Sequence, residues 1–108
     1  MADKKQLGDC LDEAKALING ERQKDYGRPD DNINTIALFW SGYLSQLTGG
    51  VVYLTGRDVC NMQSLLKIAR DIHTPKHDNC VDVAGYIAIS DFYFGGQSEI
   101  SNQKSDST

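Results

Sequence analysis

The chain has 108 residues with an apolar fraction of 40%, enough for a single domain with one modest core. Its formal net charge is −4 and its acidic and basic residues are interspersed, which argues against a protein that coats nucleic acid non-specifically. The sequence lacks an apolar run long enough to span a membrane, and its first residues lack the apolar stretch of a secretory signal. We therefore expect a cytoplasmic protein.

The cysteines also indicate a cytoplasmic protein. Cys10, Cys60 and Cys80 are odd in number, widely spaced and without a Cys-x-x-Cys pair. A disulfide framework needs an even count and a zinc site normally needs closer pairs. We expect reduced thiols that pack like small hydrophobic side chains.

Helical periodicity predicts an all-α fold of four helices, at about residues 8–23, 30–47, 55–72 and 79–94. Asp9 is a plausible N-cap for the first helix, and Pro29 can begin the second. The Thr48-Gly49-Gly50 sequence is expected to end the second helix. Residues 51–54 are rich in β-branched and aromatic side chains, but a single strand would have no partner, so we expect a loop.

The third helix begins with a capping box formed by Thr55 and Asp58. Its apolar residues cover about half of the helical circumference, more than one packing partner requires. They are Val59, Met62, Leu65, Leu66, Ile68, Ala69 and Ile72. The remaining stripe is polar and consists of Gln63, Ser64, Lys67, Arg70 and Asp71.

The fourth helix is apolar on almost every side, which predicts burial on all sides. In so short a chain, this burial implies a second subunit and hence a homo-oligomer. The glycine-rich and polar composition from Gly95 onward predicts a helical domain over residues 1–94 and a flexible tail over residues 95–108.

Two groups of residues near the turn between the first and second helices are candidate ligand contacts. Glu21 lies on the apolar face of the first helix, where a carboxylate needs a cation, a metal or a proton, unless the helix frays at Gly20. The cations Arg22, Lys24 and Arg28 surround the Tyr26-Gly27 turn and could hold a phosphate beside a helix start. The alternative is a solvated basic loop.

A second positive cluster follows in the third helix and after it. It comprises Lys67, Arg70, His73, Lys76 and His77. These residues could bind an anion, although Lys67 lies nearly opposite the densest apolar arc and the stripe could instead face solvent. His73 and His77 have i,i+4 spacing, but Pro75 disrupts the helix that such a metal-binding pair needs.

Acidic residues mark the start of the fourth helix. Asp78 or Asn79 could be its N-cap, with Asp82 placed favourably for the helix dipole. Asp82 could alternatively bind a metal or pair with a basic residue. The sequence shows no arrangement of a nucleophile with His and Asp, no phosphate loop and no dinucleotide glycine fingerprint.

Taken together, several stretches resemble a family of small proteins common in bacteriophages, over roughly residues 13–92. They are Glu21-Arg22-x-Lys24-Asp25-Tyr26-Gly27, Asn32 to Trp40, Leu66-Lys67-Ile68-Ala69-Arg70, His73-x-Pro75-Lys76-His77-Asp78 and Val81-Asp82-Val83-Ala84-Gly85-Tyr86. That family is similar in turn to the MazG-like, all-α nucleoside triphosphate pyrophosphatases. The resemblance implies a four-helix MazG-like bundle.

MazG-like enzymes hold magnesium with Glu-x-x-Glu on one helix and Glu-x-x-Asp on the next. Asp82 matches the last acid and Asn79 stands where the other acid of that motif is expected. Lys67 and Arg70 stand in place of the two glutamates of the first motif. Two cations cannot bind magnesium, but they can contact phosphate directly.

We therefore expect binding of a nucleotide, or of another phosphate-bearing small molecule, without a cofactor and without metal-dependent hydrolysis. A phage protein of this kind could sequester a host nucleotide messenger or sense a modified nucleotide. The expected ligand contacts are Glu21, Arg22, Lys24, Tyr26, Arg28, Lys67, Arg70, His73, Lys76, His77 and Asp82.

Two alternatives stay open. One is a Mg²⁺-dependent nucleoside triphosphate pyrophosphatase with a rearranged site of Glu21, Asp71, Asp78 and Asp82. The other is a phage inhibitor that binds a protein through its helical surface and needs no small ligand.

Overall fold

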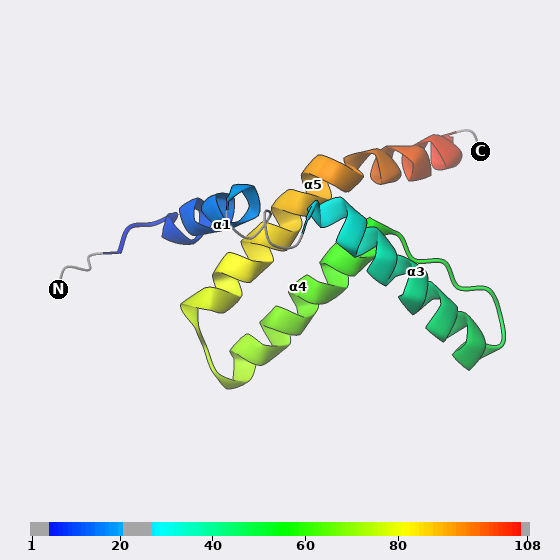
Figure 1. Ribbon diagram of the computed structural model, residues 1–108, viewed down its shortest axis with the longest axis horizontal. Coiled ribbons are helices and arrows are strands. Elements are labelled where there is room, and N and C mark those ends of the chain that lie inside the picture. The colour runs from blue at the N-terminus through cyan, green and yellow to red at the C-terminus, as the bar shows by residue number, and fades with distance from the viewer. Residues whose placement is uncertain (1–4, 21–26, 107–108) are drawn as a thin grey trace.

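The computed structural model describes residues 5–20 and 27–106, with side-chain surroundings given as far as residue 95. Over these residues the chain is all-α, as predicted, with four helices and no strand (Figure 1). The helices are α1 (Asp9–Asn19), α3 (Pro29–Thr48), α4 (Gly56–His73) and α5 (His77–Asp106). The candidate residues Glu21, Arg22, Lys24 and Tyr26 lie outside the described residues. None of the helices in the described part is both long and apolar enough to cross a membrane.

Three helix ends, both of α3 and the start of α4, are set by the local signals that the sequence carries. Pro29 is the first residue of α3, and Gly49 ends that helix in the left-handed conformation with a φ of 77°. The Thr55 hydroxyl accepts a hydrogen bond from the Asp58 amide, and the Asp58 carboxylate accepts one from the Thr55 amide. The prediction that Asp9 is an N-cap is wrong. Gly8 occupies that position with a φ of 98°, and the Asp9 carboxylate instead accepts a hydrogen bond from the Gln6 amide.

Residues 51–54 form a loop, as predicted. Two serines of α3 make the hydrogen bonds to its backbone that a neighbouring strand would otherwise make. The Ser45 hydroxyl accepts a hydrogen bond from the Val52 amide at 2.8 Å, and the Ser41 hydroxyl accepts one from the Leu54 amide at 2.8 Å. These bonds satisfy extended backbone without a sheet and hold the loop against α3.

Helix α5 differs from its predicted limits at both ends. It begins at His77 rather than residue 79, so that Asp78 lies in its first turn. The predicted end at residue 94 is wrong, because Gly95 and Gly96 lie within a helix that extends to Asp106. Glycine lowers helix stability by about 1 kcal/mol per residue but does not forbid the helical conformation. The flexibility of residues 95–108 stays a prediction.

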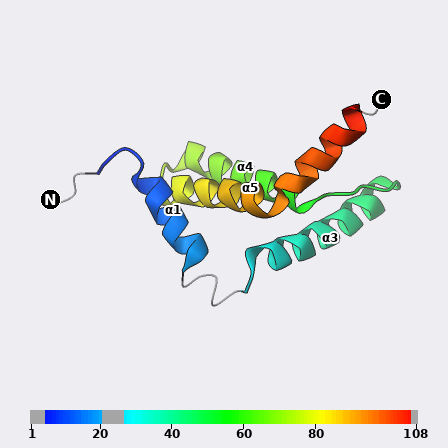
Figure 2. The ribbon, with the colours of Figure 1, turned by 90° about the horizontal axis from the view of Figure 1, so that it is seen from above.

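The helices pack around an antiparallel pair made by α4 and α5 (Figure 1). Helix α1 lies against α5, and α3 packs against the beginning of α4 and then diverges from it (Figure 2). The core lies where α3, α4 and α5 meet, and its buried members are Ile33, Ala37, Val59, Cys60 and Phe94. The Phe94 ring covers Gly56, where an added Cβ would lie 2.5 Å from ring carbons.

The resulting shape is open for a single domain. The molecule measures 55 × 30 × 30 Å and has a radius of gyration of 16.3 Å. A compact domain of about this length has a radius of gyration of about 13 Å. The excess agrees with the divergence of α3 from the α4–α5 pair and with the projection of the end of α5 beyond the other helices (Figure 1).

Helix α4 turns most of its polar stripe, all but Arg70, inward and much of its apolar arc outward. Ser64 is buried, and Gln63, Lys67 and Asp71 are half-buried, while Arg70 is exposed. Five large apolar side chains of the same helix are 40–76% exposed, namely Met62, Leu65, Leu66, Ile68 and Ile72. The interpretation of the whole stripe as a solvent-facing surface is therefore wrong for Lys67. Periodicity alone does not show which of two faces meets the neighbouring helix.

Candidate ligand-binding site

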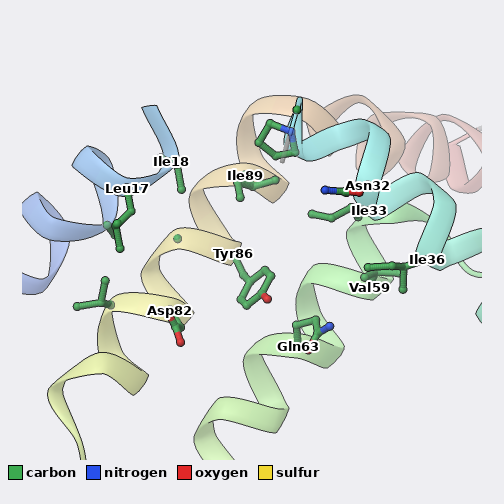
Figure 3. Close-up of a pocket in the computed structure, with 15 residues that line it drawn as sticks. Leu17, Ile18, Asn32, Ile33, Ile36, Val59, Gln63, Asp82, Tyr86 and Ile89 are labelled. Atoms are coloured by element: carbon green, nitrogen blue, oxygen red, sulfur yellow. The ribbon is translucent and has the colours of Figure 1, made fainter. Parts of the chain in front are cut away.

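A cavity of about 260 Å³ lies over α5, between α1 on one side and α3 and α4 on the other (Figure 3). Its walls are mainly aliphatic and include Ile18 of α1, Ile33 of α3 and Ile89 of α5. The Tyr86 ring projects from α5 into the space between α5 and α4 (Figure 3). An apolar cavity with few polar groups and one aromatic ring is typical of sites for small organic ligands.

The polar lining of the cavity comes from three helices. It consists of Asn32 of α3, Gln63 of α4 and Asp82 of α5. Among the described residues, Asp82 is already paired and Asn32 makes an interaction, whereas the Gln63 side chain has no hydrogen-bond partner. A half-buried amide without a protein partner is free to donate to and accept from a ligand in the cavity.

Asp82 pairs with Lys67 across the α4–α5 interface. The Lys67 ammonium lies 3.1 Å from the Asp82 carboxylate, and the two side chains are 20% and 26% exposed. Asp82 lies beyond the first turn of α5, so it is the partner of a basic residue rather than a helix cap. This outcome matches one of the three roles left open by the sequence, pairing with a basic residue. The ammonium has three donors, so Lys67 can keep this ion pair and still donate to a ligand.

Gln63, Lys67 and Arg70 form a continuous stripe along α4. Their i, i+4, i+7 spacing places them on one side of the helix, with Lys67 and Arg70 about 6 and 10 Å along the axis from Gln63. Gln63 lines the cavity, Lys67 faces α5 and Arg70 is exposed. No described residue forms an ion pair with the Arg70 guanidinium. The stripe therefore leads from an apolar cavity to an available cation.

Asp71 is held in the turn between α4 and α5. Its carboxylate accepts hydrogen bonds from the Lys76 backbone amide at 3.0 Å and from the Asn79 side-chain amide at 3.1 Å. Both bonds favour the ionised form and lower the pKa of Asp71 below its ordinary value. These contacts give Asp71 a structural role and give the buried Asn79 side chain a hydrogen-bond partner.

The acids proposed for a rearranged magnesium site do not come together in the described residues. Asp71, Asp78 and Asp82 belong to no group of three or more His, Cys, Asp or Glu side chains close enough to hold one metal ion there. Asp78 is exposed, and Asp82 faces a cation. Glu21, the fourth acid proposed, lies outside the described residues.

The other basic candidates lie apart from the stripe or have partners. The His77 ring nitrogen lies 2.6 Å from the Glu13 carboxylate, which joins the start of α5 to α1. His73 and Lys76 are exposed in or beside the α4–α5 turn. Among the described cationic residues that were proposed as ligand contacts, Lys67 and Arg70 are the two that share a stripe with the cavity residue Gln63.

Arg28 stands at the start of α3, beside two residues that line the cavity. Its guanidinium makes two 2.9 Å hydrogen bonds to Asp30 and lies over the Tyr93 ring, 5.7 Å from the ring centroid. The hydrogen bonds and the charge of Asp30 raise the pKa of Arg28. These contacts connect the start of α3 to the last described side chains of α5. Arg28 therefore has a structural role at the rim of the cavity.

Sequence reasoning did not single out three residues that line the cavity. Asn32 and Tyr86 were within the stretches that carry the family resemblance, and Gln63 was within the polar stripe of α4. The signal that could have identified Gln63 is its i,i+4 spacing from Lys67. Tyr86 has the same i,i+4 spacing from Asp82, but in a helix that is apolar on almost every side this spacing did not mark Tyr86 as a ligand contact.

The cysteines follow the sequence prediction in part. All three are free thiols, and Cys60 is fully buried in the core, where burial raises its pKa to about 11. The prediction that every cysteine packs like a hydrophobic side chain is wrong for Cys80, which is exposed near the start of α5. No cysteine belongs to the cavity lining.

A family model described as a domain of unknown function (DUF6378) matches residues 9–92, which include α1, α3, α4 and the cavity-lining part of α5. The chain belongs to this family. It is 46% identical over 77 residues to the Gene 55 protein of Mycobacterium phage D29, and 41% identical over 80 residues to the Gene 55 protein of Mycobacterium phage L5.

These matches cover 70% and 73% of this DUF6378 chain, but 47% and 48% of the two phage proteins. The chain thus spans about half the length of the curated relatives that it matches. The resemblance to phage proteins is confirmed. No solved structure matches the chain.

Proposed function

We propose that this protein binds a nucleotide or a nucleotide-derived signal, with the base in the apolar cavity and the phosphate groups toward Lys67 and Arg70. The observation that carries the proposal is the stripe of α4 that begins at Gln63 inside the cavity and ends at exposed Arg70. An amide followed by two cations along about 10 Å of helix suits a ligand with a polar aromatic end and an anionic end.

The cavity supports the base end of this proposal. Tyr86 supplies an aromatic face for stacking, and Ile18, Ile33 and Ile89 supply apolar walls. The Gln63 amide can donate and accept in one plane, as the hydrogen-bonding edge of a base requires.

The cations support the phosphate end. Charge-assisted hydrogen bonds from lysine and arginine to phosphate each contribute about 1.5–3 kcal/mol. Lys67 is held in place by Asp82, which lowers the entropy lost when it contacts a ligand. A phosphate bound directly by these residues needs no metal, so we propose binding without metal-dependent hydrolysis.

The resemblance to MazG-like pyrophosphatases is compatible with nucleotide binding. It does not extend to the magnesium site of those enzymes. Lys67 and Arg70 replace carboxylates that would hold magnesium in such an enzyme. The protein would therefore retain a nucleotide rather than cleave it, as sequestration or sensing of a host nucleotide by a phage requires.

A thermal-shift screen tests the proposal. Ribonucleoside triphosphates and cyclic dinucleotides would be added to the full chain with Mg²⁺ and, separately, with excess EDTA. A ligand present at about one hundred times its Kd should add about 2.7 kcal/mol to the free energy of unfolding, in EDTA as well as in Mg²⁺. Stabilisation of the protein that occurs only with Mg²⁺, or loss of the triphosphate that occurs only with Mg²⁺, would favour the pyrophosphatase alternative. No stabilisation under either condition would contradict nucleotide binding and favour a protein-binding inhibitor.

A further inference from the structure

The loop between α3 and α4 has the geometry of a β-strand that is paired on one edge only. Its residues alternate in exposure, with Val51 and Tyr53 95% and 78% exposed and with Val52 and Leu54 half-buried. Alternation with a period of two is the pattern of an extended chain. Figure 1 shows the loop running back along α3 to the start of α4.

The inner edge of this extended segment is paired with two hydroxyl groups of α3. The Ser45 hydroxyl accepts from the Val52 amide at 2.8 Å and donates to the Val52 carbonyl at 3.1 Å. The Leu54 amide donates to the Ser41 hydroxyl at 2.8 Å, and the Leu54 carbonyl lies 3.4 Å from the same hydroxyl. The two serines are about 6 Å apart along the helix axis, and alternate residues of a strand are about 6.6 Å apart. Because these spacings match, α3 can hold two alternate residues of an extended chain.

The outer edge of the segment is unpaired. In an extended chain, the amide and carbonyl of one residue point to one side and those of the next residue point to the opposite side. Val52 and Leu54 turn these groups toward α3, so Val51 and Tyr53 turn theirs away from it. The backbone groups of Val51 and Tyr53 have no hydrogen-bond partner within the described part of the chain. Two amides and two carbonyls therefore form an available strand edge.

The local sequence does not protect this edge. Natural sheet edges are commonly protected by charged side chains, prolines or bulges. Residues 32–56 include no charged residue and no proline, and Val51, Val52 and Tyr53 are of types favoured in strands. An exposed edge of this kind is the structure to which an extended peptide can add as a strand.

We propose that residues 51–53 bind an extended segment of another protein by β-strand addition. A strand can pair with all four outward backbone groups, whereas a helix cannot, because its own backbone groups are already bonded internally. The surroundings are uncharged, so the segment that fits is uncharged and places β-branched or aromatic side chains beside Val51 and Tyr53. The loop contributes no residue to the cavity lining, so this proposal is independent of nucleotide binding.

Peptide selection followed by amide hydrogen exchange tests the proposal. A displayed library of short random peptides would be selected on the full chain, and the tightest binder would be synthesised as the probe. Without peptide, we expect the amides of Val52 and Leu54 to be protected and those of Val51 and Tyr53 to exchange at nearly the rate of an unfolded chain. A saturating concentration of the peptide should slow exchange at Val51 and Tyr53 at least about tenfold.

Loss of a single backbone donor separates strand pairing from side-chain contact. Tyr53→Pro removes one outward N–H group and should weaken peptide binding at least about tenfold. Tyr53→Thr is the matched control, because it keeps this N–H group, and it should bind the peptide more tightly than Tyr53→Pro. If circular dichroism shows that Tyr53→Pro is unfolded, N-methylation of the peptide provides the same test. Methylation of one set of alternate peptide amides should abolish binding, and methylation of the other set should not.

Three results would overturn the proposal. The first is a selection that yields no binder, or a bound peptide that leaves exchange at Val51 and Tyr53 unchanged. The second is equal peptide affinity of folded Tyr53→Pro and Tyr53→Thr, or of the two N-methylated peptides. The third is protection of the Val51 and Tyr53 amides that increases with protein concentration in the absence of peptide, because it would assign the edge to a second copy of the chain.

Discussion

Replacement of Asp82 by asparagine tests the role of the ion pair between α4 and α5. Asp82→Asn keeps the size and shape of the side chain and removes only its charge. The amide oxygen can still accept a hydrogen bond from Lys67. The change therefore measures what the negative charge contributes to the free energy of unfolding.

The structure sets the scale of the expected loss. At 3.1 Å the direct attraction between the two charges is about 5 kcal/mol for an effective dielectric constant of about 20. Much of this attraction is offset by the cost of removing both groups from water, and the remaining exposure of 20% and 26% screens it further. We expect a net loss of about 1–3 kcal/mol, because a largely buried ammonium ion is left without a counter-charge.

Urea denaturation followed by Trp40 fluorescence would measure this loss. Asp78→Asn is the control, since Asp78 is an exposed acid in the first turn of the same helix and should contribute only about 0.3–1 kcal/mol through the helix dipole. In a double-mutant cycle with Lys67→Met, the coupling between positions 67 and 82 should exceed about 1 kcal/mol. A coupling near zero, or equal losses for Asp82→Asn and Asp78→Asn, would refute the reasoning.

Two further predictions concern packing and pH. Gly56→Ala should cost about 1–3 kcal/mol because its methyl group would meet the Phe94 ring, whereas the control Gly42→Ala should stabilise α3 by up to about 1 kcal/mol because the space is open there. Thermal melts of both variants would contradict this if Gly56→Ala matched the control. Asp71→Asn should destabilise the protein at neutral pH. The Asp71 pKa is lowered in the fold, so its stabilising effect is complete above its ordinary pKa of 3.8 and is lost as the pH falls below it. A stability difference between wild type and Asp71→Asn that stays constant from pH 7 to about pH 2 would exclude this role.

Local sequence signals predicted both ends of α3 and the start of α4, because caps depend on residues close together in the chain. The capping box of Thr55 and Asp58, the proline at the start of α3 and the left-handed Gly49 each act within a few positions. Asp9 fails as an N-cap because Gly8 occupies that position, and an acid in the first helical turn looks the same in sequence as one before it.

The orientation of α4 could not be predicted, because it depends on contacts between helices. The helical wheel shows that Lys67 lies opposite the apolar arc, and a monomer would normally turn Lys67 outward. Asp82 on α5 instead meets Lys67 at the interface. Helix α5 is apolar on almost all sides, so its periodicity gave no indication that Asp82 faces α4 or that Tyr86 faces the cavity.

The candidate site was predictable only in its charged residues, namely Lys67, Arg70 and Asp82. Lys67 and Arg70 were identified by charge and by the resemblance to MazG-like enzymes, whereas Gln63, Asn32 and Tyr86 became candidates once the cavity was visible. Asparagine, glutamine and tyrosine occur in many helices without any role in binding. Their sequence positions alone therefore do not indicate a site, and their proximity in the fold does.

Calorimetric titration in excess EDTA tests nucleotide binding by the α4 stripe most directly. The best nucleotide from the thermal-shift screen would be titrated into wild type, Gln63→Leu, Arg70→Ala and the exposed-cation control Lys15→Ala. We predict that wild type and Lys15→Ala bind equally, and that the Gln63 and Arg70 variants each lose at least about tenfold in affinity while their folds are intact by circular dichroism. Wild-type binding that disappears in EDTA, or Gln63 and Arg70 variants that bind as tightly as wild type, would contradict the assignment of the stripe to the ligand.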